Sequence, residues 1–213
     1  HAIKLMMRFC ARAILIFPIL PILYLLNPIY RIRIGTIHTQ RFGQLAINAD
    51  IFLRTMQLDG IPTRTYYFFF GYQPANHQLM NMWKRLRDFP VRYVESKLLT
   101  WLAFTWRPIV SKTRFWEMAA DTGVEYYLYN HTQPVLSLTT EEERRGREKL
   151  EAMGVSDQDW FVCIHARDGK YFHDWRPELG NYWSAMDFRS IAIENYVEAA
   201  EFITSQGGFV LRY

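Results

Sequence analysis

Three polar side chains that can do chemistry follow a short apolar run late in the chain: His165, Arg167 and Asp168. The run, residues 161–164, is apolar throughout and predicts a fully buried strand of a parallel sheet. Ligands of open α/β sheets bind beyond the carboxyl ends of such strands. Arg167 carries the forked guanidinium that makes charge-assisted bonds to phosphate groups. We therefore expect a phosphate-binding site at the end of this strand.

The other polar residues of this region have less specific roles. His165 either orients the bound group or is a hydrogen-bonded structural histidine at the end of the strand. Asp168 either acts as a base toward a hydroxyl group or pairs with Arg167. Arg189, close to an expected helix start, is a second cation for the same site.

The residues that follow predict a β-loop-α-β unit. Ser190 is expected to cap a helix whose apolar residues recur at helical spacing, and Gly207-Gly208 is expected to end it. Residues 209–211 then begin a second strand. The loop from residue 169 to residue 189 is much longer than the usual two to six residues or so. Its aromatic side chains either serve the function or only pack the loop onto the sheet.

A second candidate site lies nearer the start of the chain. Alternating residues 31–37 predict a strand, and apolar residues between 45 and 53 predict a helix. Gly43 lies in the turn between them, where a helix N-terminus offers free N–H groups and a positive dipole end. A lone glycine in such a turn is usually only a turn residue. A strand at 66–70 and a helix at 76–86 continue the pattern of a doubly wound domain.

The middle of the chain has a weaker pattern. We expect a helix within residues 98–106, a short strand at 126–129 and a helix from residue 140 to Met153. Thr140 is the expected N-cap of that last helix, with Glu143 at the capping-box position. The acidic first turn suits the helix dipole and does not indicate a metal site. The domain boundary is expected between Asn130 and Thr140.

The net charge of +4 is concentrated near the amino end. The first 33 residues contain Lys and Arg but no acidic residue, which favours an anionic membrane surface over nucleic acid. An uncharged apolar run of 14 residues, Ala13 to Leu26, falls short of the roughly 20 that span a bilayer. We expect an uncleaved anchor or an interfacial helix here. A cleaved signal and a buried core helix are the alternatives.

The sequence signals of several other classes of protein are absent. Cys10 and Cys163 lie in the apolar amino-terminal segment and in a predicted core strand, so we expect no disulfide framework. The six histidines show no metal-ligand spacing, and no nucleic-acid-binding pattern is present. We interpret the chain as a fragment, because it starts at His1 and stops just after an expected strand.

Short motifs in a fixed order resemble a known family. His165-Ala166-Arg167 resembles the His-x-Arg motif of the O-fucosyltransferase-like GT-B glycosyltransferases, and Arg41-Phe42-Gly43-Gln44 resembles their Arg-Phe-Gly-Asn-Gln loop without its Asn. The ordered set is similar to a bacterial family of surface-polysaccharide glycosyltransferases. The matching segments are Arg41–Asn48, Ala75–Leu79, Met82–Arg85, His165–Asp168, Asp187–Arg189 and Gly207–Arg212.

The resemblance implies an α/β, GT-B-like fold with two Rossmann-like, doubly wound domains, the second one truncated here. We expect a membrane-associated helix at 1–30, an acceptor-side domain at 31–135, and the start of a nucleotide-sugar-binding domain at 136–213. The implied partners are a nucleotide-sugar, a glycan or lipid-linked acceptor, and a membrane surface at the cytoplasmic face of the bacterial inner membrane. No metal or further cofactor is implied.

The same resemblance implies a role for Arg167, and we expect the other candidate residues to act beside it. Arg167 would contact the diphosphate of the donor, with His165 and Asp168 as the other candidate catalytic residues. The expected donor- or acceptor-binding residues are Arg41, Gly43, Gln44, Asn48 and Arg189.

The functional hypothesis is thus glycosyl transfer from a nucleoside-diphosphate sugar. Its alternative is a non-catalytic, membrane-associated partner in a glycan-assembly complex. A kinase or phosphatase is disfavoured because neither a Gly-x-x-x-x-Gly-Lys-Ser/Thr loop nor a Cys-x-x-x-x-x-Arg signature occurs.

Overall fold

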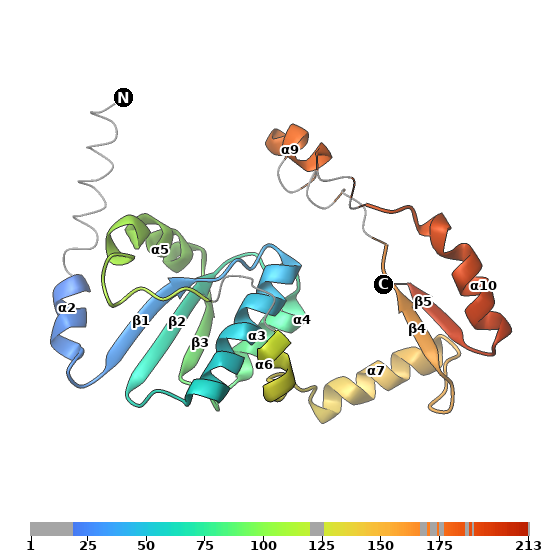
Figure 1. Ribbon diagram of the computed structural model, residues 1–213, viewed down its shortest axis with the longest axis horizontal. Coiled ribbons are helices and arrows are strands. Elements are labelled where there is room, and N and C mark those ends of the chain that lie inside the picture. Colours follow the sequence, from blue (N-terminus) through green and yellow to red (C-terminus); the bar gives the residue numbers. More distant parts are fainter. Residues whose placement is uncertain are drawn as a thin grey trace. The chain divides into compact units, whose positions relative to one another are not determined.

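The protein is an α/β protein with two compact units, divided between Ser137 and Leu138. The computed structural model describes residues 19–119, 126–166, 170, 174, 177–185, 188 and 190–212 (Figure 1). The expected α/β class is confirmed, since both units contain parallel strands joined by helices. Each unit is described by itself below.

The N-terminal unit is built on a parallel sheet. Its strands are β1 (Arg31–Thr36), β2 (Thr65–Gly71) and β3 (Val91–Glu95), in the order β1-β2-β3. The strands predicted at 31–37 and 66–70 are confirmed. β3 was not predicted, because its five residues mix apolar and charged side chains. Beyond β1, Trp116 forms an isolated parallel bridge with Ile34.

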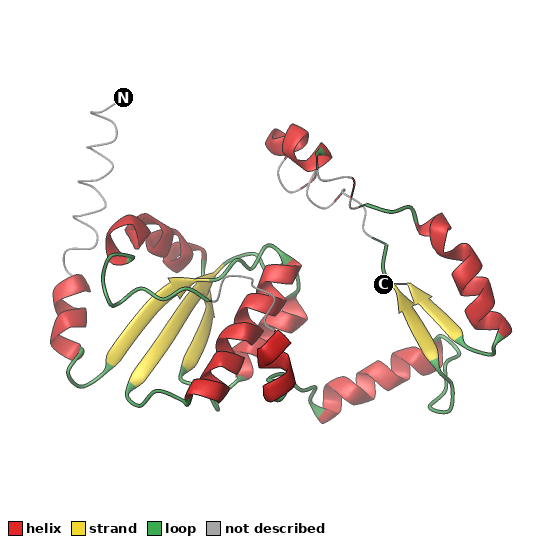
Figure 2. Cartoon of the chain, in the orientation of Figure 1, coloured by secondary structure: helices red, strands yellow, loops and turns green. Residues whose placement is uncertain are grey.

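Helices cover both faces of this sheet, which is the doubly wound arrangement (Figure 2). On one face lie α3 (Phe42–Asp59) and α4 (His77–Arg85), and they bury a core around Phe69. On the other face lie α2 (Ile19–Leu26) and α5 (Lys97–Val110), packed through Leu23 and Trp106. The helices expected at 45–53, 76–86 and 98–106 are therefore confirmed.

Residues 126–129 do not form the expected strand, since they belong to helix α6 (Tyr126–His131). The segment is aromatic, which favours a strand locally, but its tertiary contacts stabilise a helix. Leu128 is buried, and Arg54 of α3 donates to Thr132 Oγ1 at 2.9 Å just beyond the helix. Arg54 also lies over the Tyr129 ring, 4.8 Å from its centroid. These contacts hold the segment against α3 as a helical turn.

The C-terminal unit begins with α7 (Thr140–Ala152), as expected. The cap is displaced by one residue, because Thr139 and Glu142 form the capping box instead of Thr140 and Glu143. The sequence Thr-Thr-Glu-Glu-Glu satisfies the motif in both registers, so the local pattern did not distinguish them. Gly154 follows the helix in a left-handed conformation, with φ of 85°.

The predicted β-loop-α-β unit is confirmed. β4 (Phe161–Ile164) pairs in parallel with β5 (Phe209–Arg212), and α10 (Val197–Ser205) precedes β5. The connection also contains the turns η1 (Pro177–Leu179) and η3 (Ile193–Tyr196) and the short helix α9 (Gly180–Ser184).

Two local expectations for this unit are wrong. The strand at 161–164 is not fully buried: Phe161 is 41% exposed and Cys163 is exposed, whereas Ile164 is buried. The described sheet here has two strands, so few side chains cover its faces. Ser190 is not a helix cap, because η3 begins after Ala192 and leads directly into α10.

The amino-terminal segment is described from Ile19 onward. α2 contains eight residues and packs Leu23 against the sheet. Across the described ranges, no helix combines the length and the apolar character that crossing a membrane requires.

Candidate functional site

The carboxyl edge of the N-terminal sheet is where the second candidate site, around Gly43, lies. β1 leads through residues 37–41 into α3, and β2 leads through residues 72–76 into α4. The strands are parallel and neighbouring, so these two connections lie beside each other at one edge (Figure 1). This is the edge at which α/β proteins of this kind bind ligands.

Thr39 joins the two connections. Its side-chain Oγ1 donates to the carbonyl oxygen of Tyr72 at 2.6 Å and accepts from the Tyr72 N–H at 3.0 Å. Its carbonyl oxygen accepts from the Ala75 N–H at 2.8 Å. Thr39 is fully buried, whereas its partner Tyr72 is half-buried. The loop that presents the start of α3 is thus held in place.

Gly71 permits this close approach. A Cβ at Gly71 would lie 2.2 Å from Thr39 Cγ2 and 3.1 Å from Ile37 Cγ2. Both neighbours are buried and β-branched, so they have little freedom to move away. The end of β2 therefore needs glycine for packing.

The predicted residues Arg41, Gly43, Gln44 and Asn48 all lie at the amino-terminal end of α3. Arg41 is the N-cap and makes no capping bond with its side chain, and the first turn contains no acidic residue. The helix N-terminus therefore keeps its positive end uncompensated by a carboxylate. Gly43 is exposed, and a Cβ there would meet nothing within 4 Å. Packing does not require this glycine, which differs from Gly71 in that respect.

Gln44 and Asn48 share one face of α3, one turn apart. The Oε1 of Gln44 and the Oδ1 of Asn48 are buried, and neither has a hydrogen-bond partner among the described residues. Asn48 as a whole is only 6% exposed. A buried oxygen left unpaired costs about 1–3 kcal/mol, so such groups call for an explanation such as a bound donor. These two acceptors are the strongest sign of binding at this edge.

The end of β3 adds charge to the same edge. Glu95 accepts from the Lys84 ammonium at 2.6 Å, and the Ser96 N–H donates to the Gly71 carbonyl oxygen at 2.9 Å. Ser96 caps α5, and the ammonium of Lys97 lies 5.8 Å from the centre of the Tyr72 ring. Sequence reasoning missed these residues because β3 itself was not predicted. The Ser96 cap before an apolar helix was the available signal.

Glu117 is a further titratable group that sequence reasoning did not select. It follows Trp116 alongside β1, and its N–H donates to the Ile34 carbonyl oxygen at 3.0 Å. Burial raises the pKa of the Glu117 carboxyl, whereas a backbone hydrogen bond and the charge of Arg33 oppose the rise. The same carboxylate raises the pKa of Tyr67, second to burial.

In the C-terminal unit, one of the predicted catalytic residues is described. His165 is exposed and follows β4 directly, at the carboxyl end of a parallel strand. Its expected position is therefore confirmed, although its role is not tested by position. Arg167, Asp168 and Arg189 lie outside the described residues.

The structure thus brings together the four α3 residues in one unit and places His165 in the other. Among the described side chains, no three His, Cys, Asp or Glu residues gather as a metal site would require. The two units define an α/β protein with parallel sheets, which is compatible with Rossmann-like domains. No protein-family model, curated protein or solved structure matches the chain.

Proposed function

We propose that this protein is a metal-independent glycosyltransferase of the GT-B type. It moves a sugar from a nucleoside-diphosphate sugar to a lipid-linked or cell-surface glycan acceptor, at the cytoplasmic face of a bacterial inner membrane. The observation that carries the proposal is the position of two motifs. Arg41–Asn48 begins a helix at the carboxyl edge of one parallel sheet, and His165 follows a strand of the other.

The chemistry needs cations aimed at the leaving diphosphate. Negative charge builds up on the diphosphate in the transition state. Fixed positive groups that stabilise this charge usually make the largest single contribution to catalysis. Arg167, three residues after β4 in the sequence, supplies a bidentate guanidinium, and Arg189 is the second cation. His165 orients the diphosphate or the acceptor. Asp168 holds Arg167 or accepts the proton of the acceptor hydroxyl.

The α3 residues have a binding role in this scheme. The unpaired oxygens of Gln44 and Asn48 accept from hydroxyl groups of a sugar, which carries many donors. Arg41 and the free N–H groups near Gly43 attract an anionic group. These contacts make the N-terminal unit the acceptor side and leave the nucleotide to the C-terminal unit.

The experiment is a thermal-stability titration of the full protein with UDP-, GDP- and CDP-sugars. A donor at a hundred times its Kd raises the free energy of unfolding by about 2.7 kcal/mol. We expect one nucleotide class to stabilise the protein and Arg167→Ala to weaken that donor by about 1.5–3 kcal/mol. Arg145→Ala, which removes an exposed arginine of α7, is the matched control.

Two outcomes contradict the proposal. Stabilisation that is unchanged in Arg167→Ala would remove that residue from the donor site. Absence of stabilisation by every donor would favour the alternative, a non-catalytic membrane-associated partner in a glycan-assembly complex.

A further inference from the structure

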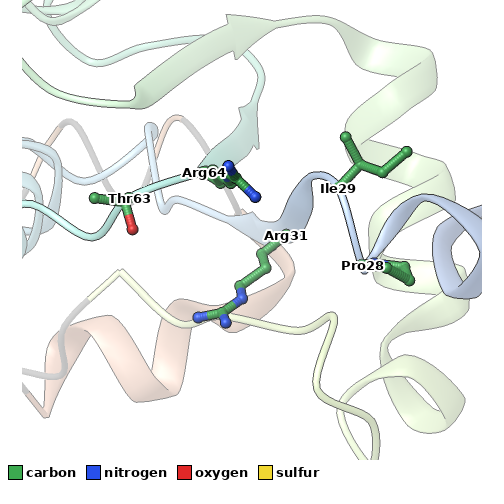
Figure 3. A pocket seen from close by; sticks show the side chains of 5 residues that line it. All are labelled: Pro28, Ile29, Arg31, Thr63 and Arg64. Carbon is green, nitrogen blue, oxygen red and sulfur yellow. The ribbon is translucent and has the colours of Figure 1, made fainter.

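A hollow of about 410 Å³ lies at the amino edge of the N-terminal sheet, the edge opposite to the candidate site (Figure 3). It is lined by Pro28, Ile29, Arg31, Thr63 and Arg64. Arg31 begins β1, and Thr63 and Arg64 form the turn before β2. Pro28 and Ile29 belong to the turn that follows α2. The hollow therefore joins two guanidinium groups to the end of an apolar helix.

The two arginines are held close by the backbone. The Arg31 N–H donates to the Arg64 carbonyl oxygen at 2.7 Å, which fixes the turn against the start of β1. Arg64 has a φ of 55°, a left-handed conformation that non-glycine residues rarely adopt. Strained backbone of this kind is a reason to look for a function at the position. Neither arginine side chain forms an ion pair within the described part of the chain.

The segment that forms the α2 and β1 side of the hollow contains no acidic residue, whereas Asp59 lies four residues before Thr63 on the other side. From Ile19 to Ala49 the sequence contains no Asp or Glu. Tyr30 and Tyr66 lie edge to face, with ring centroids 6.0 Å apart, and both are about half exposed. The α2 face, which we define by its exposed apolar side chains, consists of Ile22, Tyr24, Leu25, Ile29 and Tyr30.

This α2 face is unusual for a helix that packs on a soluble domain. Leu25 is 79% exposed, whereas Leu23 of the same helix is buried against the sheet. A third cation, Arg114, lies 6.0 Å from the centre of the Tyr24 ring. Exposed aliphatic side chains, tyrosines and arginines side by side are the composition of a membrane-interface surface. Tyrosine in particular prefers the headgroup level of a bilayer.

We infer that the α2 face lies in the surface of an anionic phospholipid bilayer, with a lipid phosphate bound between Arg31 and Arg64. The apolar side chains enter the acyl boundary, and the two guanidinium groups bind the phosphate in their forked geometry. This inference rests on the part of the proposed function that places the protein at a membrane, and it names the lipid that is bound there. It does not depend on which sugar is transferred, or on whether any is.

Vesicle binding of the full protein tests this directly. Co-sedimentation is measured with phosphatidylcholine vesicles and with vesicles that also contain phosphatidylglycerol. We expect binding to the anionic vesicles and weaker binding in high salt. Each basic residue at such a surface is worth about 1 kcal/mol, or about fivefold in partitioning. Arg31→Gln and Arg64→Gly should therefore each weaken binding about fivefold.

The variants are chosen so that misfolding does not imitate the effect. Glycine adopts a φ of 55° without strain, so Arg64→Gly keeps the turn while removing its guanidinium. Arg145→Gln is the charge control, because Arg145 is an exposed arginine of α7 in the other unit. Leu25→Gln tests the apolar part, and Ile47→Gln, at an exposed position of α3, is its control.

Three results would overturn the inference. Loss of binding in Leu25→Gln but not in the arginine variants would leave an apolar contact without a phosphate site. Unchanged binding in all variants would move the contact to another part of the chain. The arginine variants could weaken binding equally to vesicles with and without phosphatidylglycerol, while inorganic phosphate stabilises the parent protein. That result would make the hollow a site for free phosphate. Stabilisation by a nucleotide-sugar donor is measured in a separate experiment. Failure of the transferase proposal can therefore be distinguished from failure of the membrane inference.

Discussion

Thr39 and Tyr72 are joined by two hydrogen bonds through a single hydroxyl group, which donates to one backbone group and accepts from the other. The pair connects the loop after β1 to the loop after β2 at the carboxyl edge of the sheet. Since the first loop leads into Arg41 and α3, this pair positions the residues of the candidate site. The predictions below begin with it.

Thr39→Val should destabilise the protein and weaken acceptor binding. Valine keeps the shape of threonine but leaves the Tyr72 N–H and carbonyl oxygen without their side-chain partner. Each buried group left unpaired costs about 1–3 kcal/mol. Urea unfolding measures the loss. Thr105→Val, which removes an exposed hydroxyl bonded within α5, is the control and should change stability by no more than about 0.5 kcal/mol.

Two glycines at the same edge should respond in opposite directions. Gly71→Ala should destabilise by about 1–3 kcal/mol, because the new methyl meets Thr39 Cγ2. Gly43→Ala should stabilise by about 0.5–1 kcal/mol, because the position is open and helical. Titrations of Gly43→Ala with a glycan acceptor then show whether a ligand approaches the backbone there. Equal stability of the two variants would contradict the packing argument.

Glu117 should make stability depend on pH. Burial raises the pKa of its carboxyl above 4.5, so the folded state holds this proton more tightly than the unfolded state does. The free energy of unfolding therefore falls as pH rises from the ordinary carboxyl pKa to the raised one, and this group changes it no further above the raised pKa. Glu117→Gln does not titrate. Its stability relative to the parent should therefore increase between about pH 4 and about pH 7, as measured by urea unfolding. A constant difference across this range would contradict the raised pKa.

The register of the α7 cap can be tested with two neighbouring threonines. Thr139 Oγ1 accepts from the Glu142 N–H at 3.2 Å, and Glu142 Oε2 accepts from the Thr139 N–H at 2.8 Å. Thr139→Ala should cost about 0.5–2 kcal/mol, the usual value of an N-cap. Thr140→Ala should cost nothing, since Thr140 is the first helical residue and alanine is the better helix former. A larger loss of stability in Thr140→Ala than in Thr139→Ala would support the cap at Thr140 that the sequence predicted.

Several elements could be predicted because their signals are local. The strands β1, β2, β4 and β5 are short apolar or alternating runs, and α10 ends at Ser205, two residues before Gly207 with its φ of 77°. The helix expected from Asn76 is α4, and Asn76 is its N-cap, accepting from the Leu79 N–H. The location of His165 after β4 followed from the same reasoning. Each of these depends on residues within a few positions of one another.

Long-range contacts decided the rest. β3 is a strand because its backbone pairs with β2, and α6 is a helix because Arg54 and Leu128 dock it on α3. The exposure of Cys163 depends on which strands and helices cover β4, which no local pattern states. The unpaired oxygens of Gln44 and Asn48 depend on burial by other segments.

The sequence by itself determined the α/β class, most of the elements and their order, because hydrophobic period, caps and glycine stops act along the chain. Only the tertiary structure decided which polar groups are buried and which charges share a surface. Arg31 and Arg64 illustrate the difference. They are far apart in sequence, yet parallel pairing of β1 with β2 places them on one hollow. Burial and proximity are properties of the packed molecule, so they follow from long-range contacts that a local pattern does not contain.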